Sequence, residues 1–309
     1  MSKAKPHRIK SISEFHQLRG LQKPKHPSVS IVNLEEVQKF PESISNVVLD
    51  FYSISLKRNF TGTFKYGQQD YDFNEGTMFF MAPNQVFRIE QNPYEAVKQS
   101  GWKWVLLIHP DFLWNTPLAK SIKQYEFFDY FVNEALFLSE KEEATIDGII
   151  ANINQEYHSN IDKFSKQIII THIENLLSYS ERFYNRQFIT REKANHHILE
   201  RLEILLNHFF NDNDLVSKGL PSVQLVADKL NVSPNYLSSL LKVLTGQTTQ
   251  QHIHDKLIEK AKEKLTTTDL TISEIAYQLG FEHLQSFSKL FKTKTNLSPL
   301  KFRRSFNSL

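Results

Sequence analysis

Two stretches of the sequence decide its fold: SVQLVADKLNVSPNYLSSLLKVLTGQTT at 222–249 and TISEIAYQLGFEHLQSFSKLFKTKTNLSP at 271–299. They align as an internal repeat with a period of about fifty residues. Each copy reads as a helix, a tight turn and a second helix. The apolar, small and lysine positions coincide: Ala227 with Ala276, Leu230 with Leu279, Leu237 with Phe287, Leu240 with Leu290, Lys242 with Lys292, and Gly246 with Asn296.

Both copies carry the residues that a helix-turn-helix needs at its turn. Ala227 and Ala276 are small enough for two helices to approach closely. Four residues later, Asn231 and Gly280 tolerate a left-handed backbone better than most residues do. The helix ends are marked by N-cap residues, a proline at the first helical position and left-handed C-caps: Ser222, Thr271 with Glu274, Ser233 with Pro234, Gly246 and Asn296.

The second helix of each copy has an apolar stripe and a polar face. Leu237, Leu240, Leu241 and Leu244, and likewise Phe287, Leu290 and Phe291, are predicted to be ordinary core. Asn and Gln can pair with adenine and Lys can reach guanine, although each polar residue could equally be a solvated side chain. The candidate DNA-binding residues are Ser233, Asn235, Tyr236, Ser238, Ser239, Lys242, His283, Gln285, Ser286, Lys289 and Lys292.

The segment joining the two copies also fits a DNA duplex. Residues 248–265 read as one helix about 27 Å long, close to the roughly 34 Å between successive major grooves on one side of a duplex. The last 26 residues, Leu284 to Leu309, contain six basic side chains and no acidic one. A charge run is usually a solvated face, but its place in the second copy favours phosphate binding. We therefore expect the second copy to anchor through phosphates and the first to discriminate between sequences.

These residues resemble the AraC/XylS family of bacterial transcription regulators. The stretch IAYQLGFEHLQSFSKLFKTKTNLSPLKFR, 275–303, is similar to the family's second helix-turn-helix, and the match covers roughly 200–305. Departures are Asn296, where the family usually has Gly, and Asn231 in the first turn. The resemblance implies a DNA-binding domain at 196–309, with helix-turn-helix units at about 222–245 and 271–295. It also implies a transcription activator that binds double-stranded DNA and RNA polymerase, preceded by a cupin-like β-barrel for effector sensing or dimerisation.

The N-terminal part has a different pattern, so the expected fold class is α+β. From Asn46 to Ile108, short runs rich in Val, Ile, Phe and Tyr alternate with Gly, Pro and Asn, which predicts six to eight strands of a sandwich or barrel. Helices should follow from about Ser139, where Glu142 completes a capping box. They could cover the open side of the β domain or pair with a second subunit. The first domain is predicted at 1–190, and the polar stretch 187–195 is the candidate linker.

The β-rich region offers aromatic side chains but no metal ligands of the usual kind. Residues 46–108 contain no histidine and the chain contains no cysteine, so we expect no metal, no cofactor and no enzyme activity. A small-molecule effector could contact Tyr52, Tyr66, Trp102 and Trp104, although such residues more often simply pack a barrel.

Two other functions compete with DNA-binding regulation: a cupin-type enzyme with an appended helical domain, and a pure interaction protein. The enzyme lacks a ligand cluster. The basic run at 284–309 and the groove-matched length of the helix at 248–265 argue against the interaction protein. With no apolar run of 18 residues and no apolar core in its first residues, the chain is expected to be cytoplasmic and without a membrane partner.

Overall fold

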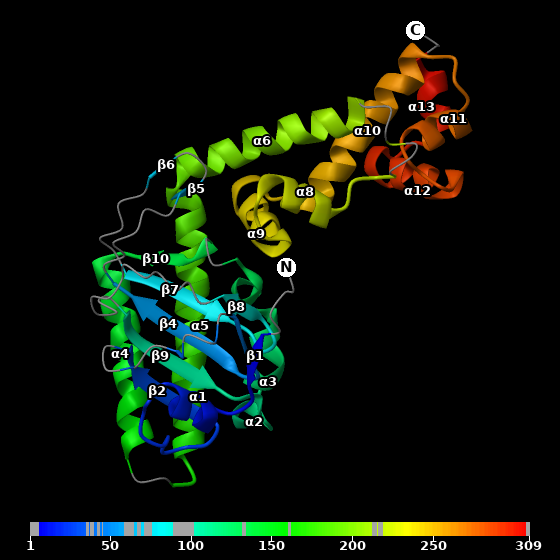
Figure 1. The fold of residues 1–309 in the computed structure, drawn as a ribbon. Coiled ribbons are helices and arrows are strands. Elements are labelled where there is room, and N and C mark those ends of the chain that lie inside the picture. The colour runs from blue at the N-terminus through cyan, green and yellow to red at the C-terminus, as the bar shows by residue number, and fades with distance from the viewer. Residues whose placement is uncertain are drawn as a thin grey trace. The chain divides into compact units, whose positions relative to one another are not determined.

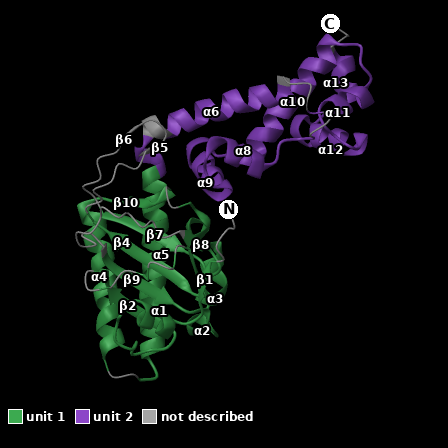
Figure 2. Cartoon of the chain, in the orientation of Figure 1, with its two compact units in different colours: residues 1–187 green, residues 188–309 purple. Residues whose placement is uncertain are grey.

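The computed structural model divides the chain into two compact units, residues 1–187 and 188–309 (Figures 1 and 2). The first unit contains sheets and helices, and the second contains helices throughout its described part, so the mixed α+β class is confirmed. The described residues are 6–34, 37, 40–41, 44, 46–58, 65–66, 69–70, 76–88, 102–131, 134–159, 162–211, 215 and 219–306.

Two sheets dominate the first unit, and a short hairpin accompanies them. The five-stranded sheet has the order β10-β7-β4-β9-β2, with strands Leu136–Leu138, Gly76–Met81, Tyr52–Lys57, Trp102–Ile108 and Val29–Asn33. The three-stranded sheet has the order β1-β3-β8, with strands His7–Ile9, Asn46–Leu49 and Val86–Arg88, and the hairpin joins β5 (Lys65–Tyr66) to β6 (Gln69–Asp70). Among the described residues seven strands, β3 to β9, fall between Asn46 and Ile108, as expected.

One hydrophobic core lies between the two sheets. Val47 of the small sheet meets Val105 and Leu107 of the large one, and α1 (Ile12–Leu18) closes the cluster with Ile12 and Phe15. Each such side chain contributes about 1.5–3 kcal/mol when it is fully buried. In the described residues the hydrogen-bonded strands form separate sheets, so the expected closed barrel is not confirmed.

Helices cover the outer face of the large sheet. The short ones are α2 (Pro110–Leu113), α3 (Leu118–Ser121) and the 3-10 turns η2 (Ile122–Gln124) and η3 (Glu126–Asp129); the long ones are α4 (Glu140–His158) and α5 (Ser165–Thr190). The expected capping box is present, because the Ser139 hydroxyl and the Glu142 carboxylate each accept from the other residue's amide. The Arg186 guanidinium of α5 donates two hydrogen bonds to the Glu142 carboxylate, which fixes α5 against the start of α4.

The polar stretch 187–195, expected to be the linker, is helical on both sides of Arg191. It ends α5 and begins α6 (Glu192–Asn211). Two of its polar side chains are buried and bond to the backbone: Gln187 Oε1 accepts from the Phe137 amide at 2.8 Å, and the Asn195 amide donates to the Phe188 carbonyl. Part of the polarity of this stretch, at Gln187 and Asn195, therefore serves buried hydrogen bonds.

The second unit consists of α6 and two similar helix pairs on either side of a longer helix. The pairs are α8 (Val223–Leu230) with α9 (Pro234–Thr245), and α11 (Ile272–Gln278) with α12 (Leu284–Thr295); α10 (Thr249–Thr267) joins them and α13 (Pro299–Phe306) follows. Among the described residues, no helix is both long enough and apolar enough to span a bilayer.

Candidate nucleic-acid interface

The first helix pair has the caps and the turn that its sequence predicted. The Ser222 hydroxyl accepts from the Leu225 amide and starts α8, which ends at Asn231 with φ 59°. The Ser233 hydroxyl accepts from the Tyr236 amide at 3.2 Å and starts α9. Gly246, with φ 74°, ends α9 in the left-handed region, as expected for a C-cap.

The second pair repeats this plan with different residues. Thr271 and Glu274 form the expected capping box of α11, and the bond from the Thr271 amide lowers the pKa of the Glu274 carboxyl. Gly280 forms the turn at φ 83°. A Cβ there would lie 3.1 Å from both the Gly219 carbonyl carbon and the Leu215 oxygen, so glycine is needed for space as well as for conformation. Asn296, at φ 60°, ends α12.

Both second helices bury the predicted stripe. Leu237, Leu240 and Leu241 are fully buried in α9, and Phe287 and Phe291 are fully buried in α12. Leu244 and Leu290 are half-buried at the edge of each stripe. The two alanines are fully enclosed where the helices of each pair meet, which agrees with the need for a small residue there.

The joining helix α10 holds the two pairs in one body. Its capping box, Thr248 with Gln251, and its buried face of Ile253, Leu257, Ala261 and Leu265 are as predicted. Its 19 residues span about 28 Å. The joining helix of a paired helix-turn-helix can therefore place α9 and α12 near successive major grooves.

Sequence reasoning missed two contacts that fix α12 and α13 to α10 and the segment that follows it. The Lys294 ammonium of α12 lies 2.7 Å from the Asp255 carboxylate of α10, which also accepts from the Gln247 amide group. The Arg303 guanidinium of α13 donates to the Leu265 and Leu270 carbonyls, just where α10 ends. Arg303 belongs to the LSPLKFR signature, so a signal was present, whereas nothing in the spacing pairs positions 255 and 294.

The candidate DNA-binding residues of α12 and its N-cap are open to solvent. All five side chains are exposed: His283, Gln285, Ser286, Lys289 and Lys292. The backbone therefore brings amide, hydroxyl, imidazole and ammonium groups together along one helix, which suits contacts to base edges and phosphates.

The candidates of α9 are less accessible. Lys242 is exposed, but Asn235, Ser238 and Ser239 are half-buried, and the Ser238 hydroxyl hydrogen-bonds to that of Thr249 at 3.0 Å.

Two of the candidates, Ser233 and Tyr236, are only 1% and 3% exposed, so the expectation that Tyr236 lies on the polar face is wrong. The Ser233 hydroxyl is occupied by its cap, and the Tyr236 ring packs edge-on against Phe188 with centroids 5.2 Å apart. Tyr236 lies four residues before Leu240, so the spacing already placed it beside the buried stripe.

Two of the four candidate effector residues of the first unit share the outer face of the large sheet. Tyr52 and Trp104 lie on the side opposite the inter-sheet core, in register with Ile108 and Leu56 respectively. The Trp104 indole donates to Asp147 of α4 at 3.2 Å. The Tyr52 ring meets Phe128, and burial together with nearby Asp129 raises its pKa. The side chains of Tyr66 and Trp102 lie outside the described residues.

A buried ionic cluster, also missed in the sequence, lies behind this face. The Glu143 carboxylate of α4 is 3% exposed and pairs with Arg58 at 2.6 Å and Lys103 at 3.1 Å. Burial alone would lower the pKa of Lys103, but hydrogen bonds to Asp147 and Glu143 raise it. A Cβ on Gly76 would stand 2.8 Å from the Glu143 Oε2 atom, so glycine makes room for the carboxylate. Within the described ranges, no group of three or more His, Asp or Glu residues is placed to hold a metal.

Known proteins resemble the second unit. A family model described as a helix-turn-helix domain matches residues 226–305. An uncharacterised HTH-type transcriptional regulator from the cgkA 5' region of Pseudoalteromonas carrageenovora is 34% identical over 102 residues, which are 33% of this chain and 55% of that protein. The regulator YobQ of Bacillus subtilis is 29% identical over 118 residues, 38% of this chain and 46% of that protein.

Among solved structures, the C-terminal domain of AraT, a response regulator from Geobacillus stearothermophilus, is 33% identical and covers 35% of this chain and 84% of its own, with a TM-score of 0.31. The chain thus spans about half of the length of the two curated relatives. With its two capped helix pairs, the second unit of this chain carries a helix-turn-helix domain of the AraC/XylS type, similar to those of HTH-type transcriptional regulators.

Proposed function

We propose that the chain is a sequence-specific, DNA-binding transcription regulator whose second unit places α9 and α12 in successive major grooves. The observation that carries this proposal is the pair of capped helix-turn-helix units fixed to one α10 helix, with exposed polar and basic side chains on α12. We further propose, by analogy with the family, that it acts in the cytoplasm and activates transcription through RNA polymerase.

The first unit, 1–190 in the predicted division, would be a cupin-like domain that senses an effector or pairs subunits. Its two packed sheets around one core support a cupin-like origin. Tyr52 and Trp104 would influence an effector response from the outer face of the large sheet, where both side chains already have protein partners. The alternative is a cupin-type enzyme with an appended helical domain. Among the described residues, no group of three or more His, Asp or Glu side chains is placed to hold the metal that such an enzyme would use.

Selection of genomic duplexes by the full chain tests this function. The chain should retain a small set of fragments that share a sequence, and its affinity for them should fall as salt rises, because neutralised phosphates release counterions. Equal retention of all fragments, or retention that does not depend on salt, would contradict the proposal. Repeating the selection with candidate metabolites would show whether an effector changes the bound set.

A further inference from the structure

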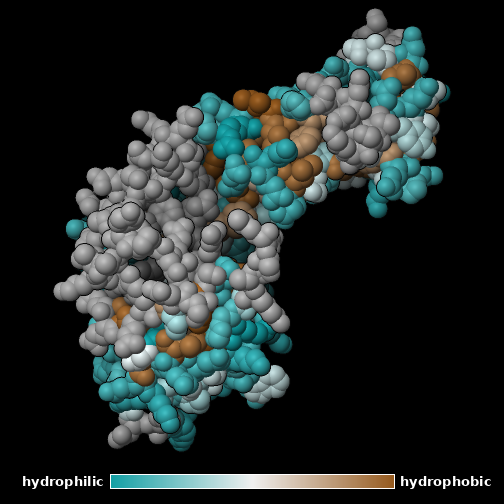
Figure 3. Space-filling model, viewed as in Figure 1, coloured by the Kyte–Doolittle hydropathy of each residue, from teal (hydrophilic) through white to brown (hydrophobic). Residues whose placement is uncertain are grey.

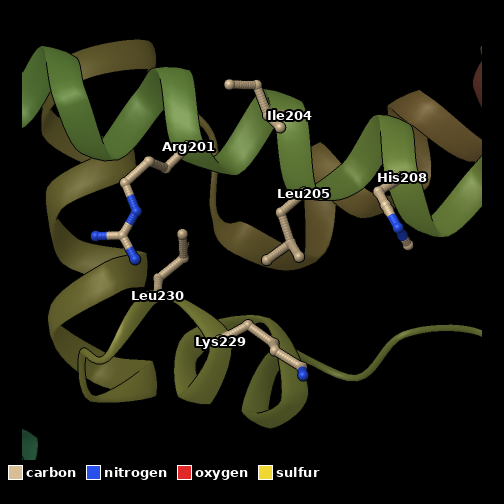
Figure 4. A pocket seen from close by; sticks show the side chains of 6 residues that line it. All are labelled: Arg201, Ile204, Leu205, His208, Lys229 and Leu230. Carbon is tan, nitrogen blue, oxygen red and sulfur yellow. The ribbon is translucent and has the colours of Figure 1, made fainter.

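A groove runs between α6 and α8 within the second unit, away from the polar side chains of α12. It encloses about 260 Å³ and is lined by Arg201, Ile204, Leu205, His208, Lys229 and Leu230. Arg201, Leu205 and His208 project from α6 toward α8, which presents Lys229 and Leu230 opposite them (Figure 4). The recognition of DNA as proposed above leaves these residues without a role.

Apolar side chains line the groove between the two helices, and one of them is strongly exposed. Leu205 is half-buried and Leu230 is buried between the two helices, whereas Ile204, 69% exposed, lies at the edge of the groove and points away from α8 (Figure 4). Figure 3 shows apolar surface where α6 and α8 lie in Figure 1. Exposing a large aliphatic side chain beside other apolar groups costs hydration free energy that a partner's apolar side chains would recover.

The rim of the groove is basic. Neither Arg201 nor Lys229 has an ion pair within the described part of the chain. Other lysines of this unit do have partners: Lys256 pairs with Glu259, Lys260 with Glu263, and Lys294 with Asp255. The two unpaired cations flank apolar side chains, so this surface is complementary to a partner that carries both carboxylates and aliphatic groups.

We propose that this groove docks an acidic amphipathic segment of another protein. A helix of that kind lays its apolar face into a hydrophobic groove, and its carboxylates would meet Arg201 and Lys229 at the rim. The groove is smaller than the roughly 300–1,000 Å³ of sites that enclose small ligands, and its exposed wall at Ile204 leaves it open on one side. A phosphate backbone would satisfy the two cations but would gain nothing from the apolar side chains.

The test uses the full chain and two fluorescent helical peptides with the same leucine spacing. One peptide has glutamate at its polar positions, and its twin has lysine there. Fluorescence anisotropy should show the acidic peptide binding at least about tenfold more tightly than the basic one. The double variant R201E/K229E should lose the acidic peptide and prefer the basic one, and Ile204→Asp should weaken binding of the acidic peptide. Equal binding of both peptides, or no binding, would overturn the proposal.

A matched control separates the groove from the net charge. K123E/K141E makes the same change in charge at exposed positions of the first unit and should leave peptide binding unaltered. Circular dichroism melting checks that each variant is folded, and R201E/K229E remains decisive if Ile204→Asp unfolds, since it alters only the rim. Duplex DNA affinity should be the same in both double variants. A larger loss of DNA affinity in R201E/K229E would assign the cations to DNA and overturn the docking site without removing the proposed DNA binding.

Discussion

The helices α9 and α12 begin after a turn and end on a left-handed residue in the same way, yet their surfaces differ. In α9 the Tyr236 ring is buried against Phe188, and Ser238 is bonded to Thr249. In α12 the side chains of Gln285 and Ser286 are exposed. The repeated motif sets the backbone of each helix-turn-helix, but the elements packed around it decide which of its side chains remain available for contacts with DNA.

This difference changes the expected division of labour. From the sequence, discrimination between DNA sequences was assigned to the first helix-turn-helix, because its second helix is rich in Ser, Asn and Tyr. In the first helix-turn-helix, the side chains of Asn235 and Ser239 are half-buried and that of Tyr236 is buried. We therefore expect the second helix-turn-helix to supply base contacts as well as phosphate contacts, and the first helix-turn-helix to add a smaller share of the discrimination.

The largest expected effect compares equivalent positions of the two helices. Tyr236→Ala should destabilise the fold by about 3 kcal/mol, because it removes a buried aromatic ring, as large core truncations do. Ser286→Ala, fifty positions later and exposed, should change stability by less than about 0.5 kcal/mol. Urea unfolding of both variants measures the contrast, and similar losses would mean that α9 and α12 are equally open.

The next largest effect should be the difference in stability cost between substitutions in the two helix-turn-helix turns. Gly280→Ala should cost about 1–3 kcal/mol of stability, because it adds strain at φ 83° and a contact with the backbone at 215 and 219. Asn231→Ala should cost about 1 kcal/mol, since it meets only the left-handed penalty. Thermal melting provides the comparison, with Asn231→Gly as a control that should remain as stable as the parent chain. If Gly280→Ala melted with the parent, the packing around this turn would be misassigned.

A smaller effect should appear in sequence preference. Gln285→Ala should relax discrimination at one base pair by about 1–3 kcal/mol, since an exposed amide can pair with adenine at two positions. Asn235→Ala should relax it less, because the Asn235 side chain is half-buried. Binding to a panel of single-base variants of the selected duplex measures both effects. A greater loss of discrimination for Asn235→Ala would mean that the first helix-turn-helix makes most of the base contacts.

The smallest expected change concerns phosphate contacts. Lys292→Ala should weaken binding to all sequences alike and reduce the slope of log affinity against log salt by about 1. Lys242→Ala should behave in the same way, because both lysines are exposed near the end of their helix. Salt titrations on specific and unrelated duplexes check this. A change confined to the specific duplex would identify Lys292 as a base contact.

Local chemistry made much of the second unit predictable. Caps and turns depend on residues three or four positions apart, so Ser222, Ser233, Thr271 and Asn296 could be assigned from sequence and are found as expected. The buried stripes follow from helical periodicity in the same way.

What could not be predicted depends on partners far apart in the chain. Tyr236 is covered by Phe188, and Asp255 is paired with Lys294. The carboxylate of Glu143 is enclosed by Gly76, Lys103 and Arg58, which lie in β7, in β9 and just after β4. The same limit applies to the first unit, where the strands were predicted but their arrangement in two sheets was not. Local periodicity carries no information about which strands become neighbours.

Hydroxyl-radical footprinting of the full chain on its selected duplex tests the central claim most directly. The paired units on α10 predict two protected stretches on one face of the duplex, about 34 Å apart. They also predict that Gln285→Ala weakens the protection of one stretch and that Asn235→Ala weakens the protection of the other. A single protected stretch, or both weakening together with either substitution, would contradict an interface built from two separately placed helices.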